Sequence, residues 1–261
     1  MLFSKRFGMM SVTAILLLTA SGGRPSQAAA ADSTPARREE TMCCKVTKLA
    51  QAPTIDAKWD KFPWQSLAPE RICRYMGEKP AHFPQAEVKI AYDEAALYLI
   101  FRVQDRYVRA VTAECQGAVC QDSCVEFFFT PCADVSQGYF NVEVNCGGTV
   151  LFNFQRARQK DVVEIPEAEC RKLSIAHSMP RIVDPEIATP VTWMVEYRVP
   201  IEILKKYCPA AVSPTAGTVW RANFYKCGDN TSHPHWLTWS RVDFPRPQFH
   251  LPECFGVLKF E

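Results

Sequence analysis

The sequence predicts an all-β protein, an antiparallel β-sandwich with few short helices. In several segments apolar residues recur at every second position, which is typical of strands that bury one face. Turn residues separate these segments, and most of the 19 prolines fall between them. Many short alternating strands with turns between them favour two packed sheets.

A hairpin is the first clear element, over residues 86–105 with the sequence AEVKIAYDEAALYLIFRVQD. Apolar residues alternate over 88–92 and again over 97–103, with a turn at 93–95. The period of two and the short turn predict two paired strands.

The same alternation predicts further strands at residues 122–130, 138–154 (a hairpin that turns at Gly147–Gly148), 192–200, 218–227 and 254–261. One stretch has a helical pattern: PIEILKKYC, residues 200–208, with proline at the first position. No internal repeat or linker interrupts residues 45–261, so we expect one domain there.

The N-terminal segment predicts export. Residues 1–31 carry Lys5 and Arg6, then an apolar run too short to span a bilayer, then small residues, which is the layout of a secretory signal peptide. Residues 32–44 are expected to form a flexible leader. No other segment is long enough for a membrane span, so the sequence predicts a secreted or periplasmic protein.

The charge balance disfavours polyanionic partners. Residues 1–31 hold three basic side chains and no acidic ones, which leaves 27 basic and 28 acidic residues in the rest of the chain. We therefore expect neither nucleic acid nor an anionic membrane as a partner.

Twelve cysteines and the export signal predict disulfides, although the pairing cannot be derived from the sequence. The alternative is that several of them are buried free thiols. No CxxC pair is present, which disfavours a zinc finger, and the metal ligands stay unassigned.

Three strands present unusual polar residues on the face opposite their apolar one, because neighbouring side chains of a strand point to opposite sides. These candidate ligand-binding residues are Glu126, Tyr139, Asn141, Glu143, Arg221, Asn223 and Tyr225. Sugar hydroxyls both donate and accept hydrogen bonds, so amides, carboxylates and a guanidinium suit them. The alternative is that Arg221 only pairs with Glu126 or Glu143 across the sheet.

The segment HPHWLTWS, residues 233–240, adds two indoles. Trp236 and Trp239 are three apart, so on a strand they face opposite ways, and we expect one in the core and one on a rim. An exposed indole can stack on the face of a pyranose ring. The alternative is that both indole rings lie in the core. The nearby His233 and His235 lack the further ligands that a metal site needs.

Several segments, in this order, resemble the carbohydrate-binding module family 9: APTIDAKWDKFPWQSL, VKIAYDEAALYLIFRVQD, DSCVEFFFTP, GYFNVEVNCGGTVL, WMVEYRVPIEIL, WRANFYKC and HWLTWSRVDFPRPQFHLPECFGVLKF. The resemblance covers residues 45–261 and implies a β-sandwich of the jelly-roll or immunoglobulin-like kind. It also implies binding of sugar chain ends on a concave face by aromatic rings and polar side chains. We therefore expect a non-catalytic protein that binds oligosaccharide or polysaccharide ends and supports secreted glycoside hydrolases in polysaccharide degradation.

The resemblance also implies roles for single residues. Glu126 matches the site carboxylate of the family, Asn141 and Asn223 match its polar contacts, and Trp236 or Trp239 matches a stacking ring. AVCQD stands where the family has another tryptophan, which makes Tyr139 and Tyr225 the candidates to replace it. Calcium is a structural ion in the family, with no ligands assignable here.

Two other functions stay open. Glu126 and Glu143 on neighbouring strands could act as an acid–base pair on a glycoside, although no nucleophile motif supports an enzyme and no catalytic residue is assigned. The wider sandwich superfamily includes haem-binding domains, and Met76, Met179 and Met194 are available as axial ligands, but CxxCH is missing.

Overall fold

Sixteen strands dominate the computed structural model, which describes residues 41–261. The predicted signal peptide, residues 1–31, lies outside the described residues, as does most of the predicted leader, residues 32–44. The first strand, β1 (Cys43–Lys48), begins two residues before the predicted domain start at residue 45. The predicted all-β fold class is confirmed.

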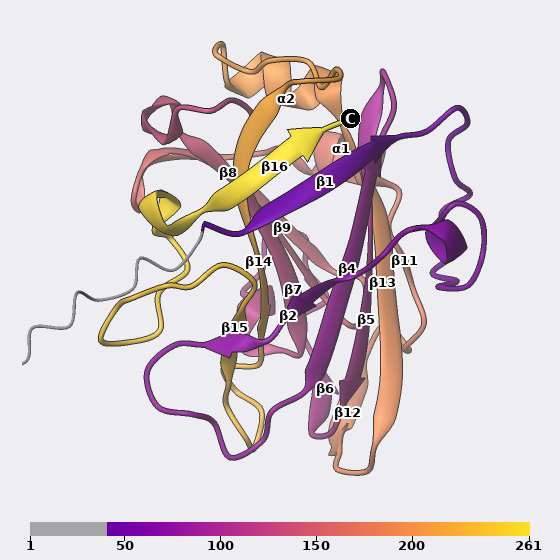
Figure 1. Cartoon of the computed structure of the whole chain (residues 1–261). Helices are drawn as coiled ribbons and strands as arrows, with labels where there is room; N and C mark the ends of the chain where they lie inside the picture. The colour runs from indigo at the N-terminus through magenta and orange to yellow at the C-terminus, as the bar shows by residue number, and fades with distance from the viewer. Residues whose placement is uncertain (1–40) are drawn as a thin grey trace, which may run out of the picture. The chain divides into compact units, whose positions relative to one another are not determined.

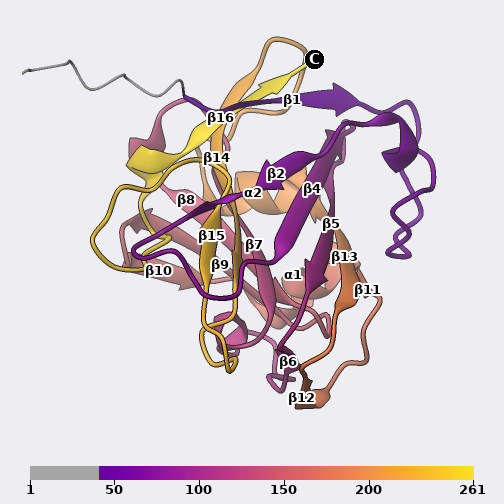
Figure 2. The same ribbon diagram turned by 60° about the horizontal axis from the view of Figure 1, so that its bottom comes forward.

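Two sheets face one another, and β1 belongs to both (Figures 1 and 2). The first sheet has the order β10-β9-β8-β7-β14-β16-β1, and the second has the order β1-β4-β5-β13-β11. Their bounds are β4 (Gln85–Tyr92), β5 (Ala96–Asp105), β7 (Cys124–Thr130), β8 (Tyr139–Asn145), β9 (Val150–Ala157), β10 (Lys160–Glu164), β11 (Ala176–His177), β13 (Val191–Pro200), β14 (Val219–Cys227) and β16 (Gly256–Phe260). The pairing is antiparallel except where β1 runs parallel to β16 and β4.

Short elements complete the described part of the chain. The strands are β2 (Glu70–Ile72), β3 (Arg74–Tyr75), β6 (Val108–Ala110), β12 (Val183–Ile187) and β15 (Trp236–Thr238), and the helices are α1 (Glu167–Cys170) and α2 (Ile201–Tyr207). Single 3₁₀ turns lie at Trp64–Ser66, Val119–Gln121, Val135–Gln137, Arg171–Leu173 and Pro252–Cys254. Neither helix of residues 41–261 has the length and hydropathy needed to cross a membrane.

The predicted strands and the helix at 200–208 are present, and their apolar faces meet in the main core. Phe127 of β7 stacks on Phe224 of β14, with ring centroids 5.2 Å apart, and Phe224 lies 6.4 Å from Phe101 of β5 in the other sheet. All three side chains are fully buried. Alternation along the strands therefore fixes which face of each sheet points inward.

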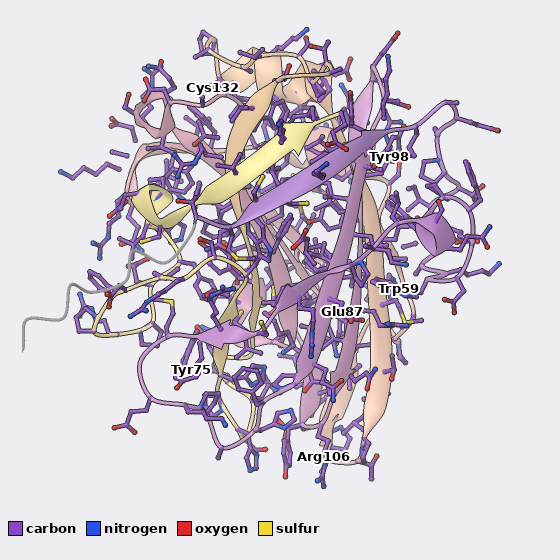
Figure 3. All side chains as sticks on the ribbon, in the orientation of Figure 1. Trp59, Tyr75, Glu87, Tyr98, Arg106 and Cys132 are labelled. Atoms are coloured by element: carbon purple, nitrogen blue, oxygen red, sulfur yellow. The ribbon has the colours of Figure 1, made fainter. Side chains whose placement is uncertain are left out.

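Both outer faces of the sandwich are partly covered. Residues 49–67 lie on the second sheet, where the Trp59 ring sits beneath Lys89 and Arg102, and Arg102 pairs with Glu87 at 2.7 Å (Figure 3). The segment 242–255 lies on the outer face of the first sheet and adds Phe249 and other apolar side chains to a separate cluster there. This second covering forms one side of the candidate site.

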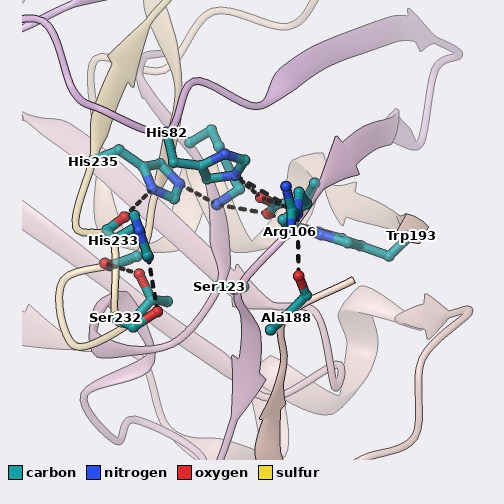
Figure 4. A network of polar contacts seen from close by, with 12 residues as sticks. His82, Arg106, Ser123, Ala188, Trp193, Ser232, His233 and His235 are labelled. Atoms are coloured by element: carbon teal, nitrogen blue, oxygen red, sulfur yellow. Dashed lines mark hydrogen bonds and ion pairs between the residues drawn. The ribbon is translucent and has the colours of Figure 1, made fainter. Parts of the chain in front are cut away.

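A buried polar network joins the two sheets (Figure 4). Lys226 of β14 lies 3.3 Å from Asp105 of β5, and both side chains are fully buried. Asp105 also contacts His82 at 2.7 Å, while the Lys226 ammonium lies 2.6 Å from Nε2 of His235. The charged pair is thus enclosed by polar partners, as a buried ion pair requires.

The predicted disulfides are not present: all twelve cysteines are free thiols in the structure. Seven of them are buried, at Cys44, Cys124, Cys132, Cys146, Cys170, Cys208 and Cys227. Buried cysteines pack as small apolar residues in these strands and loops, which is the alternative that the cysteine count left open.

Candidate functional site

A pocket of about 500 Å³ opens over the outer face of the first sheet. Its floor comes from β7, β8 and β14, and its walls come from the segments around residues 229–236 and 246–250. The lining residues are Cys120, Glu126, Phe128, Glu143, Gln159, Cys227, Asp229, Trp236, Arg246, Pro247, Gln248, Phe249 and His250.

Two carboxyl groups face each other on the floor. Glu126 and Glu143 are direct partners in the register of β7 and β8, so both side chains point to the same face. Burial and the neighbouring Glu143 raise the pKa of Glu126, and burial raises the pKa of Glu143 to about 7. The pair therefore retains a proton at neutral pH and can both donate and accept hydrogen bonds.

A chain of buried hydrogen bonds holds Glu143. The Glu143 carboxylate accepts from the Asn141 amide at 2.9 Å, and the Asn141 carbonyl oxygen accepts from Gln155 at 3.0 Å. Gln155 in turn accepts from the Tyr139 hydroxyl at 2.9 Å. Asn141 and Tyr139, both predicted as ligand contacts, thus lie behind the floor and orient the carboxylate.

Trp236 forms a wall of the pocket. Its indole is half-buried, and its Nε1 donates to Asp229 at 2.8 Å, which fixes the orientation of the ring. Burial raises the pKa of Asp229. An oriented ring beside two carboxyl groups is an arrangement that can hold a sugar, because it offers a stacking face and polar partners together.

The opposite wall is the segment 246–250. Phe249 stacks on Tyr225, with ring centroids 4.1 Å apart, and so attaches this segment to β14. His250 lies 2.9 Å from the Tyr139 hydroxyl, and burial followed by the nearby Arg158 lowers its pKa to about 4, so its ring is neutral at pH 7. The Arg246 side chain at the rim has no hydrogen-bond or ion-pair partner within residues 41–261.

Three other predicted residues bond to the chain within or next to the covering segment and do not line the pocket. Arg221 donates to the carbonyl groups of Gly256 (3.0 Å) and Phe255. Asn223 bonds both the carbonyl oxygen and the amide of Ser240, at 3.1 and 2.8 Å. The Tyr225 hydroxyl donates to the carbonyl of Phe249 at 3.2 Å.

The two tryptophans of HPHWLTWS separate as their spacing predicts, one on a rim and one in the core. Trp239 is fully buried, donates to Glu70 at 2.8 Å and lies 5.4 Å from the Phe224 ring. It has no exposed face on which a sugar could stack. Of the two, only Trp236 lines the pocket.

Sequence reasoning missed most of the walls and part of the floor. Alternation places Phe128 on the same face as Glu126, and it places Cys227 on the same face as Tyr225, so the period-two pattern could also have identified Cys227. Asp229, Gln159 and residues 246–250 belong to irregular segments that no periodicity describes.

The structure offers few candidate ligands for the predicted calcium ion or for a haem iron. Within residues 41–261, one group of three potential metal ligands lies close together, formed by Cys124, Glu126 and Cys227. Two of these ligands are thiols, and calcium prefers oxygen ligands, so the group does not fit calcium. Calcium therefore stays a prediction without assigned ligands. Met76, Met179 and Met194 do not line the pocket.

Comparison with family profiles identifies a family for this chain. The carbohydrate-binding family 9 profile matches residues 60–260. A proposed carbohydrate-binding protein from Bacteroides uniformis is similar, with 26% identity, a TM-score of 0.76, and coverage of 85% of this chain and 100% of that one. A comparison with curated proteins gave no match.

Two solved structures of family 9 modules from Caldicellulosiruptor kristjanssonii share the fold. The complex with glucose has 15% identity and a TM-score of 0.59, covering 84% of this chain and 96% of that one. The complex with cellotriose has 14% identity and a TM-score of 0.59, covering 84% and 94%. By its profile match over most of its length, the chain belongs to carbohydrate-binding family 9.

Proposed function

We propose that the pocket binds the end of an oligosaccharide or polysaccharide without catalysing a reaction. One observation carries the proposal: a pocket of about 500 Å³ brings the half-buried Trp236 indole beside the paired carboxyl groups of Glu126 and Glu143. This volume lies within the roughly 300–1,000 Å³ typical of small-ligand pockets.

The polar lining supports hydroxyl recognition. Glu143 is held by Asn141 and lies opposite Glu126, and the pair shares a proton, so adjacent sugar hydroxyls would meet an acceptor and a donor. Arg246 and Gln159 offer further donors at the rim. Glucose and cellotriose, the ligands of the two C. kristjanssonii modules, are the first compounds to test.

Trp236→Ala tests the stacking contribution. If stacking removes about 50 Å² of apolar surface, it contributes about 1.3 kcal/mol, so the variant should bind cellotriose roughly tenfold more weakly. Calorimetric titration of wild type and variant measures this, with affinities expected between micromolar and millimolar. Phe62→Ala removes an exposed aromatic residue outside the pocket and should leave the affinity unchanged.

The proposal fails if neither sugar nor a wider glycan panel binds, or if Trp236→Ala and Phe62→Ala behave alike. Turnover is tested separately by incubating the protein with cellotriose and quantifying the released sugars. Product formed by wild type but not by Glu126→Gln would favour the glycosidase alternative.

Export and cooperation with secreted glycoside hydrolases belong to the same proposal. Residues 1–31 support export by their basic start, apolar run and small residues. Mass spectrometry of the protein from its native host should find an N-terminus near residue 32, and an intact Met1 in the mature protein would contradict export. Co-purification of a glycoside hydrolase from the same culture tests the partner.

A further inference from the structure

Two thiols and a carboxyl group converge at the floor of the pocket. The ligand atoms of Cys124, Glu126 and Cys227 all lie within 4.8 Å of one another, and the Cys227 sulfur lies 3.0 Å from Glu126 Oε1. All three side chains are buried, with 0%, 2% and 1% exposure. Within the described residues, this is the one such close group of potential metal ligands.

The strand register produces this cluster. Cys124 of β7 and Cys227 of β14 are direct partners, so their side chains lie next to each other on one face. Glu126 is two residues along β7 from Cys124 and therefore points to the same side. Ligands on paired strands are held more rigidly than ligands on loops, which favours a preformed site.

We propose that Cys124, Glu126 and Cys227 bind a single thiophilic divalent cation of the zinc class. Zinc takes cysteine sulfur and carboxylate oxygen in a four-coordinate arrangement, whereas calcium and magnesium require mostly oxygen ligands. Three protein ligands leave one position for water or another donor, as in open zinc sites.

Access to the cluster comes from the pocket. Glu126 and Cys227 both line it, so a cation could reach these two ligands from the cavity. Cys120 lines the same pocket, and its backbone carbonyl lies 3.5 Å from the Cys227 sulfur. Besides Cys227, Cys120 is the one cysteine of the described residues on the pocket lining.

Cysteine and glutamate bind a cation in their deprotonated forms, so a bound cation would replace the protons of the cluster. The affinity should consequently increase with pH.

Cobalt(II) is the probe for a direct test. The protein is reduced, freed of reductant and metal without oxygen, and titrated with cobalt(II) and then zinc in the absence of sugar. We expect one equivalent of cobalt to give a sulfur-to-cobalt charge-transfer band, which zinc then removes. Cys124→Ser and Cys227→Ser should each weaken the band and the affinity. Because the titration contains no sugar, its result does not depend on the proposed sugar binding.

Two further variants control for folding and for other thiols. Glu126→Gln keeps the side-chain shape and both sulfurs, so the band should persist while affinity falls at least about tenfold. Cys170→Ser alters a second pair of neighbouring thiols, Cys115 and Cys170, and should leave the titration unchanged. Circular dichroism confirms that each variant is folded.

The titrations would overturn the proposal if they gave no charge-transfer band in the reduced wild type, a full band in folded Cys124→Ser and Cys227→Ser, or unchanged affinity in Glu126→Gln. A Cys124–Cys227 disulfide in the protein as purified, found by peptide mass mapping, would overturn it as well.

Discussion

At the scale of single residues, hydrogen-bond partners decide which polar side chains are available to a ligand. Asn141 and Asn223 lie on the same face of the first sheet, both fully buried. Asn141 directs its amide to Glu143 on the pocket floor, whereas both ends of Asn223 are bonded to Ser240. Residue type alone did not distinguish the two.

Gln155 is the central residue of the polar chain behind Glu143, so Gln155→Leu should destabilise the protein. Replacing Gln155 leaves the Tyr139 hydroxyl, the side-chain carbonyl oxygen of Asn141 and the backbone N–H of Gln159 without this hydrogen-bond partner. Unsatisfied buried groups cost about 1–3 kcal/mol each, so we expect a loss of at least about 2 kcal/mol in urea unfolding.

Gln159→Ala is the matched control for that measurement. The Gln159 side chain lines the pocket and has no hydrogen-bond partner within residues 41–261, so its truncation should change the free energy of unfolding by less than about 0.5 kcal/mol. Equal effects of the two variants would show that the polar chain does not contribute to stability.

At the scale of elements, the strands were predictable and the segment covering them was not. Alternation placed Glu126, Asn141 and Tyr225 on one face, and the register of β7, β8 and β14 confirms that arrangement. The segment 242–255 has no period and carries several prolines, so nothing in its sequence indicated that it would cover this face. The pocket exists because this segment leaves part of the face open.

Tyr225→Phe tests how the covering segment is held. The change removes the hydroxyl that donates to the Phe249 carbonyl at 3.2 Å and keeps the ring that stacks on Phe249. We expect a loss of about 1 kcal/mol in stability and faster amide hydrogen exchange at residues 246–250.

Tyr98→Phe is the control, because it removes a hydroxyl that donates to Asp93 at 2.7 Å in the hairpin turn of the other sheet. Exchange at residues 246–250 should then match wild type. If Tyr225→Phe also leaves that exchange unchanged, the hydroxyl does not hold the segment.

At the scale of the whole molecule, the two sheets are joined by polar contacts as well as by the apolar core. Lys226 and Asp105 come from opposite sheets, and no pattern in the sequence indicates their pairing, because they are far apart in the chain and each lies in an ordinary strand pattern. Removing one partner of a buried ion pair leaves the other charge buried and uncompensated, so a change of either side chain should destabilise this junction.

His235 makes this junction sensitive to acid. Burial, and then the neighbouring Lys226, lower the pKa of His235 to about 3, whereas an unfolded histidine titrates near 6.5. Between these values the unfolded chain binds a proton that the folded protein does not, so the stability present above pH 6.5 is lost as the pH falls. Burial raises the pKa of Asp105, but the contacts with Lys226 and His82 lower it by more, so the pKa lies below its usual value. Asp105 therefore also stabilises the folded protein less as the pH falls, at lower pH than His235.

His235→Asn should therefore flatten the acid dependence of stability. From pH 6.5 to pH 4.5, wild type should lose about 2 kcal/mol more than the variant in urea unfolding, because the slope rises to about 1.4 kcal/mol per pH unit below pH 6.5. NMR titration provides the second measurement, since the ring signals of His235 should not shift between pH 7 and pH 4.5. Parallel stability curves for the two proteins, or a His235 titration near pH 6.5, would mean that the histidine is not held neutral between the sheets.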